Sequence, residues 1–366
     1  MTGLYIHVPF CGRRCIYCDF FSTTLLHKRY HYVNVVRREL KTRRTDDKIA
    51  TIYIGGGTPT MLAKEQLEKI LACIHANYDV AQDAEITLEA NPENVTRNMM
   101  QCMPINRLSM GVQSFNDARL RFLNRRHTAG QAKNAVWIAR EMGIENISID
   151  LMYGLPWQTL DEWRNDVEEA LALRVPHLSA YALSYESGTV LHQMWEQGEV
   201  RKADEELSRA MYYHLCEAAE AAGYEHYEIS NFALPGFHSR HNSSYWDGTP
   251  YLGFGPGAHS YDGKRLRRSN PNSISDWNKG QYDEEELSDN DLFNERIFLS
   301  LRTSRGLDIE SLQQTFPQQT ADIMPTLQRH IDAGRLVQHT PYVRLSREAI
   351  FTSDDIRSDL FAQNGK

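Results

Sequence analysis

The amino-acid sequence predicts an α/β protein built around a parallel sheet and followed by a smaller, mostly helical domain. Short apolar segments alternate with segments of helical periodicity through the first 235 residues, which is the pattern of repeated βαβ units. Helical patterns then return near residue 291 without alternating strands. A chain of 366 residues is also long enough for two domains.

Six short apolar segments predict strands, at residues 4–8, 49–54, 85–90, 107–112, 146–152 and 177–183. Helical spacing predicts the helices around them, at residues 30–41, 61–76, 116–124, 130–142, 160–173 and 204–222. Gly223 directly follows the last of these helices, where a C-terminal cap is expected. This alternation implies right-handed crossovers and a parallel sheet. The pattern alone leaves open whether the sheet is flat or curves into a partial barrel.

The pattern changes after residue 235. Glycine, proline, asparagine, serine and tyrosine dominate up to residue 272 with no clear period. Helical patterns follow at residues 294–302, 309–314 and 320–333, and residues 336–344 have the character of a small hairpin. We therefore predict three parts: a core of residues 1–235, an irregular connecting segment of residues 236–290, and a helical, winged-helix-like module of residues 291–366.

The composition is that of an ordinary globular chain, with 41% hydrophobic and 24% charged residues. The formal net charge of -8 gives no global field that would favour nucleic acid. We find no basic-then-apolar leader and no run of 18 apolar residues. These features predict a cytoplasmic protein without a transmembrane segment, and they leave peripheral contact with a membrane open.

Three cysteines near the start form the most informative motif, because Cys11, Cys15 and Cys18 follow directly on the first predicted strand. An ordinary [4Fe–4S] cluster is held by four cysteines. A site with three thiolates leaves one iron open to an exogenous ligand.

Two other interpretations of this motif are a structural zinc site and a disulfide. Zinc usually takes four protein ligands from two closely spaced pairs, whereas the other cysteines, Cys73, Cys102 and Cys216, are isolated. Disulfides fit small secreted chains better than this one. The spacing therefore favours the cluster.

Further polar and glycine signals follow the predicted strands. The run Gly55 to Gly57 ends the second strand, Glu89 ends the third, Gln113 follows the fourth, and Asp150 lies within the fifth. Loops at the carboxyl ends of parallel strands build the sites of α/β proteins. We therefore expect these residues to meet the cysteine loop at one end of the sheet.

Together these segments resemble the radical S-adenosylmethionine superfamily and, more narrowly, the oxygen-independent coproporphyrinogen III oxidase family. The resemblance runs over nearly the whole chain. It is carried, in the family's order, by residues 5–11, 55–60, 89–92, 107–115, 124–125 and 150–156. It implies a partial (β/α)6 barrel of parallel strands.

The resemblance also implies roles for single residues. Cys11, Cys15 and Cys18 would hold a [4Fe–4S] cluster whose open iron binds the methionine part of S-adenosylmethionine. The residues implied to contact the nucleoside or line its pocket are Tyr5, Tyr17, Gly56, Gly57, Thr58, Glu89, Gln113, Arg125 and Asp150. The carboxylates would suit the ribose hydroxyls, and Arg125 would suit the nucleoside's carboxylate.

Two departures place the chain nearer the haem-chaperone branch of this family than its oxidases. The oxidases carry an N-terminal extension and a fourth cysteine two residues after the third, whereas this chain has Phe20 there. The sequence His241-Asn242-Ser-Ser-Tyr245-Trp246 resembles the H-N-x-x-Y-W motif of the haem-binding branch. Imidazole is a common haem ligand, and aromatic rings pack on a porphyrin. His238 and His259 are alternative ligands.

We therefore expect a protein that binds haem and transfers it to an acceptor that the sequence does not identify, with a reductant such as flavodoxin or ferredoxin as a further partner. The alternatives are an oxygen-independent coproporphyrinogen III oxidase and a radical enzyme with an unrelated substrate. An aromatic-rich segment covering one end of the sheet, with His241 only hydrogen-bonded, remains open for the H-N-x-x-Y-W residues.

Overall fold

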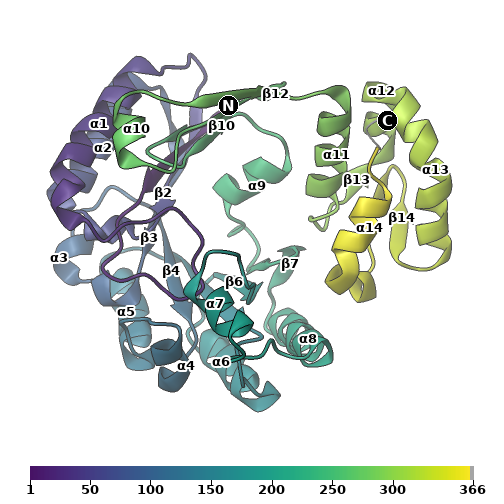
Figure 1. Ribbon diagram of the computed structural model, residues 1–366, viewed down its shortest axis with the longest axis horizontal. Coiled ribbons are helices and arrows are strands. Elements are labelled where there is room, and N and C mark those ends of the chain that lie inside the picture. The colour runs from purple at the N-terminus through teal and green to yellow at the C-terminus, as the bar shows by residue number, and fades with distance from the viewer. Residues whose placement is uncertain (363–366) are drawn as a thin grey trace.

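Six parallel strands form the centre of the fold in the computed structural model, which describes residues 1–362 (Figure 1). They are hydrogen-bonded to one another in sequence order, as the alternating pattern predicts. Their bounds are β1 Thr2–Val8, β2 Ile49–Gly56, β3 Val80–Ala90, β4 Arg107–Gln113, β5 Asn146–Tyr153 and β6 His177–Ala182.

The sheet is curved. Side chains from β2 through β6 all line one common cavity on its inner face. Residues alternate between the two faces of a strand. In β1, Leu4, Ile6 and Val8 are fully buried in the hydrophobic core. Tyr5 and His7 lie on the opposite, inner side, where the hydroxyl of Tyr5 is 3.0 Å from His7 Nδ1. The predicted partial (β/α)6 barrel is therefore confirmed.

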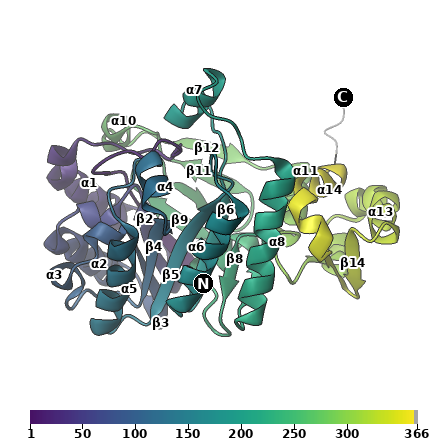
Figure 2. The same ribbon diagram turned by 90° about the horizontal axis from the view of Figure 1, so that it is seen from below.

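Helices follow these strands and most of them cover the outer face of the sheet, whereas the seventh projects at the end of the barrel beside the cysteine loop (Figures 1 and 2). Their starts carry strong sequence signals: Thr159 and Glu162 form a reciprocal capping box at the start of the sixth helix. Gly223 follows the eighth helix with φ of 86°. The bounds are α1 Arg29–Thr42, α2 Lys64–Asn77, α3 Arg97–Met100, α4 Asp117–Phe122, α5 Ala129–Glu141, α6 Leu160–Ala172, α7 Val190–Glu196 and α8 Glu205–Ala221.

The segment 236–290 differs from the irregular structure that the sequence predicts. It contains short elements, namely α9 Arg240–Trp246, β9 Tyr251–Phe254, β10 His259–Tyr261, β11 Leu266–Ser269, α10 Ile274–Asn278 and β12 Asp283–Glu286. Strand β9 pairs in parallel with β1, and β10 to β12 continue the sheet antiparallel. Beyond β6, the sheet is extended by β8 Asn231–Ala233 and β7 Glu225–Glu228. Strands of three or four residues are too short to show a period, which is why the sequence pattern missed them.

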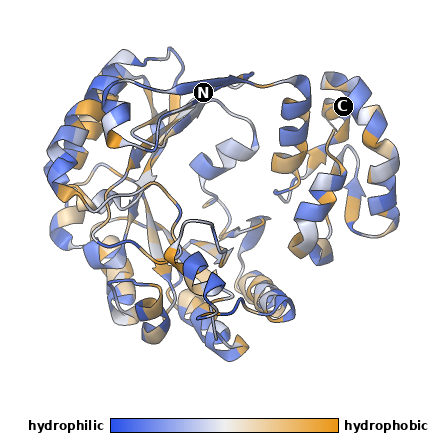
Figure 3. Cartoon of the chain, in the orientation of Figure 1, coloured by the Kyte–Doolittle hydropathy of each residue, from blue (hydrophilic) through white to orange (hydrophobic). Residues whose placement is uncertain are grey.

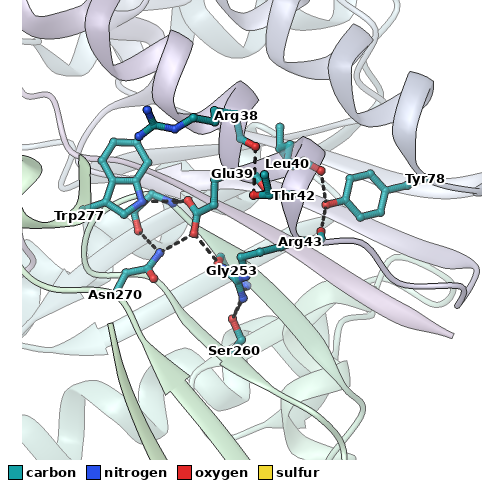
Figure 4. Close-up of polar contacts among 11 residues, drawn as sticks. Arg38, Glu39, Leu40, Thr42, Arg43, Tyr78, Gly253, Ser260, Asn270 and Trp277 are labelled. Atoms are coloured by element: carbon teal, nitrogen blue, oxygen red, sulfur yellow. Dashed lines mark hydrogen bonds and ion pairs between the residues drawn. The ribbon is translucent and has the colours of Figure 1, made fainter. Parts of the chain in front are cut away.

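A buried ion pair on α1 anchors this added part of the sheet (Figure 4). Glu39 and Arg43 lie 2.8 Å apart, with side chains only 11% and 14% exposed. The Glu39 carboxylate also accepts hydrogen bonds from Asn270 Nδ2 and the Trp277 indole N–H, while Arg43 donates to the carbonyl oxygen of Gly253 at 2.7 Å. One helix thus fixes three separate points of the segment 236–290.

The C-terminal part has a separate hydrophobic core and lies beside the barrel (Figures 1 and 2). Its helices surround a small antiparallel sheet, as the helix-then-hairpin pattern predicts. The bounds are α11 Asp289–Ser300, β13 Leu307–Asp308, α12 Ile309–Thr315, α13 Pro317–Asp332, β14 Leu336–His339, β15 Tyr342–Leu345 and α14 Ser353–Asp359. Arg302 pairs with Glu228 at 3.3 Å and so ties this module to β7.

The helices carry both hydrophilic and hydrophobic residues, as Figure 3 shows. In α1 the buried positions include Tyr32, Val33, Val36 and Leu40, which recur at helical spacing. Such a stripe fits a helix packed on a sheet. No helix among the described residues is both long enough and apolar enough to cross a membrane.

The Glu39 contacts generate a stability prediction. Replacing Glu39 with Ala leaves the guanidinium of Arg43 without its carboxylate and removes the acceptor of Asn270 and Trp277. We expect the free energy of unfolding to fall by about 3 kcal/mol, since breaking a buried pair costs this order of energy. Chemical denaturation followed by circular dichroism measures the change. Arg38→Ala is the control, because Arg38 makes only exposed contacts with Asn278; a loss no larger for E39A than for R38A would contradict the prediction.

Candidate functional site

The three motif cysteines lie together at the carboxyl end of β1 and line a cavity of about 500 Å³. All are free thiols, with Cys11 buried and Cys15 and Cys18 half-buried. Backbone hydrogen bonds hold their loop in place: the Cys11 N–H donates to the carbonyl of Thr23 at 2.9 Å, and the Cys18 N–H donates to the carbonyl of Cys15 at 3.4 Å. The fold thus brings the three thiols to the wall of one cavity.

Among the described residues, no group of three or more histidine, cysteine, aspartate or glutamate side chains is placed to hold a single metal ion. A four-iron cluster needs no such convergence, because each of its cysteines binds a different iron. Burial raises the pKa of Cys11, and it raises the pKa of Cys18 to about 11. Metal binding at this loop must therefore displace protons from these thiols.

The glycine turn after β2 packs directly on the cysteine loop. The Gly57 N–H donates to the carbonyl oxygen of Val8 at 2.8 Å. A Cβ at Gly57 would lie 3.0 Å from three backbone atoms of residues 8–10, and a Cβ at Gly56, where φ is 108°, would lie 2.7 Å from the His7 ring. Only glycine permits this approach. Gly56, Gly57 and Thr58 line the cavity, where the sequence places them.

Two carboxylates from neighbouring strands face the same cavity. Glu89 on β3 accepts hydrogen bonds from the Tyr53 hydroxyl at 2.6 Å and from the Gly56 N–H at 3.0 Å. Asp150 lies on β5. Burial raises the pKa of Glu89 to about 7 and that of Asp150 to about 6. Both groups therefore titrate near neutral pH and can accept hydrogen bonds from hydroxyl groups of a ligand when ionised.

Gln113 and Arg125 complete the rim of the cavity. Gln113 adopts a left-handed conformation with φ of 69°, which is uncommon for residues other than glycine. The Arg125 guanidinium donates to Asn91 Oδ1 at 2.8 Å and to Cys15 Sγ at 3.5 Å. Asn91 in turn donates to Thr58 Oγ1 at 3.2 Å. Arg125 thus braces the cysteine loop, while its expected contact with the nucleoside's carboxylate stays a prediction.

The two tyrosines predicted to line the cluster pocket lie in different surroundings. Tyr17 lines the cavity with the cysteines. Tyr5 is not part of that lining: its ring packs against Tyr53 and His241, with centroid separations of 6.1 and 6.4 Å.

The H-N-x-x-Y-W residues form α9, which lies between the parallel strands and α11 (Figure 1). His241 is 1% exposed, and both of its ring nitrogens have partners, Thr51 Oγ1 at 2.8 Å and the Tyr245 hydroxyl at 2.9 Å. Asn242 lines the large cavity, whereas Tyr245 and Trp246 line a second one. The helix is therefore a wall shared by two cavities.

The alternative histidines, His238 and His259, line neither of these two cavities. His238 pairs with Glu225 at 2.8 Å and stacks on Tyr227.

The sequence analysis missed polar residues on the inner face of β4 to β6. These side chains line the same cavity as the carboxylates: Arg107, Ser109, Ser148, His177, Ser179 and Tyr181. His177 bridges Ser148 Oγ and the Tyr227 hydroxyl, each at 2.7 Å. The available signal was the polar residue at every second position of apolar strands, which marks a polar lumen.

Comparison with known proteins gives the family. Residues 5–170 match the profile of the radical SAM superfamily, and residues 287–352 match the HemN C-terminal domain. The "Heme chaperone HemW" of Lactococcus lactis is 37% identical over 86% of this chain and 85% of that protein. The protein of the same name from Bacillus subtilis is 34% identical over 93% of both. This chain belongs to the HemW family of the radical SAM superfamily.

Radical SAM membership gives the chain a [4Fe–4S] cluster and S-adenosylmethionine as cofactors. The thiols, the glycine turn and the inward carboxylates of the cavity fit both groups. The solved structure of HemN, the coproporphyrinogen III oxidase of Escherichia coli, has the same fold, with a TM-score of 0.84 over 99% of this chain and 90% of that one. At 22% identity this likeness concerns the fold alone.

The thiol arrangement predicts the effect of a single substitution. Cys15→Ala should remove most of the brown absorbance that appears on anaerobic reconstitution with iron and sulfide, because two thiolates are too few to retain the cluster. Cys102→Ala, at an exposed cysteine outside the cavity, is the matched control and should keep the full absorbance. Equal iron and sulfide contents in the two variants would contradict the assignment.

The raised pKa of Glu89 predicts a pH dependence of nucleoside binding. The ionised carboxylate accepts hydroxyl hydrogen bonds and the protonated form accepts them poorly, so affinity should rise with pH through 7. A single group of this pKa changes its ionised fraction about tenfold between pH 6 and 8. Anaerobic calorimetry of S-adenosylmethionine binding to the reconstituted protein measures this dependence.

Glu89→Gln is the control for this experiment. The amine of S-adenosylmethionine titrates equally with both proteins, so the difference between them isolates Glu89. The variant should bind more weakly at pH 8 and should show a smaller rise. An identical pH profile for the two proteins would refute the assigned role of Glu89.

Proposed function

We propose that this protein binds haem and delivers it to an acceptor protein, with a [4Fe–4S] cluster and S-adenosylmethionine held in its barrel. The observation that carries the proposal is the cysteine loop, which directs three thiols into the cavity and offers no fourth. Phe20 stands where the oxidases have a cysteine, and its side chain is 64% exposed. The chaperone name of relatives that match along most of their length supports the same conclusion.

In this proposal, different cavity residues hold the cluster and the separate parts of the nucleoside. Cys11, Cys15 and Cys18 hold the cluster, and the turn of Gly56 and Gly57 gives the methionine part of the nucleoside room beside it. Glu89 and Asp150 accept hydrogen bonds from the ribose. Polar contacts from Gln113, Arg125 and Thr58 orient the rest, with Tyr17 closing the cluster pocket.

When bound and reduced, the cluster and nucleoside supply one-electron cleavage of a carbon–sulfur bond. The chain itself orients the nucleoside and excludes water. The proposal includes a cytoplasmic one-electron reductant of the flavodoxin or ferredoxin class.

We further propose that haem engages α9, the helix of His241, Asn242, Tyr245 and Trp246. The hydrogen bonds of His241 restrict how this helix can bind haem. Iron coordination by His241 requires loss of its hydrogen bond to Thr51 or to Tyr245. Burial lowers the pKa of His241 to about 3, so the ring is neutral at physiological pH. A neutral imidazole accepts a hydrogen bond at one ring nitrogen and donates one from the other, and these two bonds hold Tyr245 in position.

The runner-up function is oxidative decarboxylation of coproporphyrinogen III. The shared fold with HemN supports only a common architecture. No observation in the cavity favours that activity over haem delivery.

A haem titration beside a turnover assay tests the proposal. Reconstituted protein should bind haem with a saturable change of the Soret band and release it to an apo haem protein. Under the same anaerobic conditions it should convert no coproporphyrinogen III. Turnover of coproporphyrinogen without saturable haem binding would reverse the assignment.

A further inference from the structure

A second cavity, of about 290 Å³, lies where α9, the strands β9 and β10, and the C-terminal module meet. We call it the junction cavity. Tyr245 and Trp246 form its α9 wall, Tyr251 and Tyr261 lie on the added strands, and Phe316 follows α12. Its volume is at the lower end of the range for ligand pockets, roughly 300–1,000 Å³. It therefore takes one edge of a large flat ligand.

The rings of the junction cavity form a connected aromatic surface. Tyr245 meets Tyr251 edge-to-face, with centroids 4.8 Å apart, and Tyr251 lies 6.4 Å from Tyr261. The guanidinium of Arg267 lies over the Tyr261 ring at 5.8 Å. Such rings give a conjugated ligand apolar contact area.

The charges of the junction cavity favour an anion. Lys264, Arg267 and Arg296 line it, opposed only by Glu295. Arg267 pairs with Glu295 at 2.8 Å, whereas Lys264 and Arg296 have no ion-pair partner in residues 1–362. The lining thus carries an excess of two positive charges on a protein whose formal net charge is -8. Two carboxylates would balance this excess.

Donor groups here are also left without acceptors. The Trp246 indole N–H and the Arg267 Nε are buried and have no hydrogen-bond partner in the described chain. Burying an unpaired polar group costs free energy that a ligand carrying acceptors can recover.

A third cavity, between α8, β7 and the C-terminal module, lacks this excess of positive charge. Its lining has a thiol and an imidazole, those of Cys216 and His226, but four glutamates face three arginines there. A dianion gains nothing from such a balance. The barrel cavity is also a poor choice for haem, because it is the proposed place of the cluster and the nucleoside and His241 does not line it.

We propose that haem binds at the junction cavity, with its two propionates against Lys264 and Arg296 and one edge of its ring against Tyr245 and Tyr261. This assignment rests on the proposed haem function and adds the location of the haem site. His241 then acts as a positioning residue, since its hydrogen bond holds Tyr245 in the wall. The two ligands occupy opposite sides of α9, with Asn242 toward the nucleoside and Trp246 toward the haem.

The test is a haem titration of the full-length protein, followed by the Soret band and tryptophan fluorescence. Lys264→Glu/Arg296→Glu changes two exposed side chains and should weaken haem binding at least tenfold. Lys41→Glu/Arg201→Glu makes the same change in net charge on exposed residues outside the junction cavity and should change the affinity less than twofold. Thermal unfolding checks that both proteins fold.

A second probe, haem dimethyl ester, isolates the propionates. It should bind the wild type more weakly than haem does, and K264E/R296E should bind it as the wild type does. If wild type and K264E/R296E bind haem equally, the junction site is wrong while the haem function stands. If the wild type shows no saturable haem binding, the proposed function itself fails.

Discussion

The site depends on the close approach of two backbones, those of the cysteine loop and the glycine turn. The hydrogen bond from the Gly57 N–H to the Val8 carbonyl fixes this approach, and a single Cβ would obstruct it. Because β1 and β2 are parallel neighbours, their carboxyl ends arrive at the same edge of the sheet. The thiols and the glycine turn therefore face one cavity.

The curvature of the sheet determines the chemistry inside it. Side chains at alternate positions of β2 to β6 converge, so carboxylates that would be solvated on a flat sheet are desolvated here. This is why the pKa values of Glu89 and Asp150 rise toward neutrality. A partly dry lumen suits a ribose that offers hydroxyl donors, and it keeps water from reactive groups.

Much of this arrangement could be predicted from the sequence, because alternating apolar and helical segments define β1 to β6 and the motifs fall at their ends. The added strands could not, since β9 to β12 are three or four residues long. The motif around His241 was visible, but a motif does not reveal which side chain of a helix faces which cavity. Tyr5 and Arg107 show the same limit: the pattern does not reveal that Arg107 lines the cavity and Tyr5 does not.

Helix α9 lies between the two proposed ligand sites, since one face meets the barrel lumen and the other meets the C-terminal module. The Glu39–Arg43 pair holds the strands beside it, so fold and site share one anchor. This arrangement allows a nucleoside and a haem to be bound at once, with only a helix of seven residues between them.

The central claim is that an incompletely ligated iron in the barrel takes the nucleoside as its remaining ligand. Electron paramagnetic resonance of the reduced, reconstituted protein tests it most directly. We predict the signal of a [4Fe–4S] cluster whose g-values shift when S-adenosylmethionine is added. A signal that is the same with and without the nucleoside, in protein with full iron and sulfide content, would contradict the account.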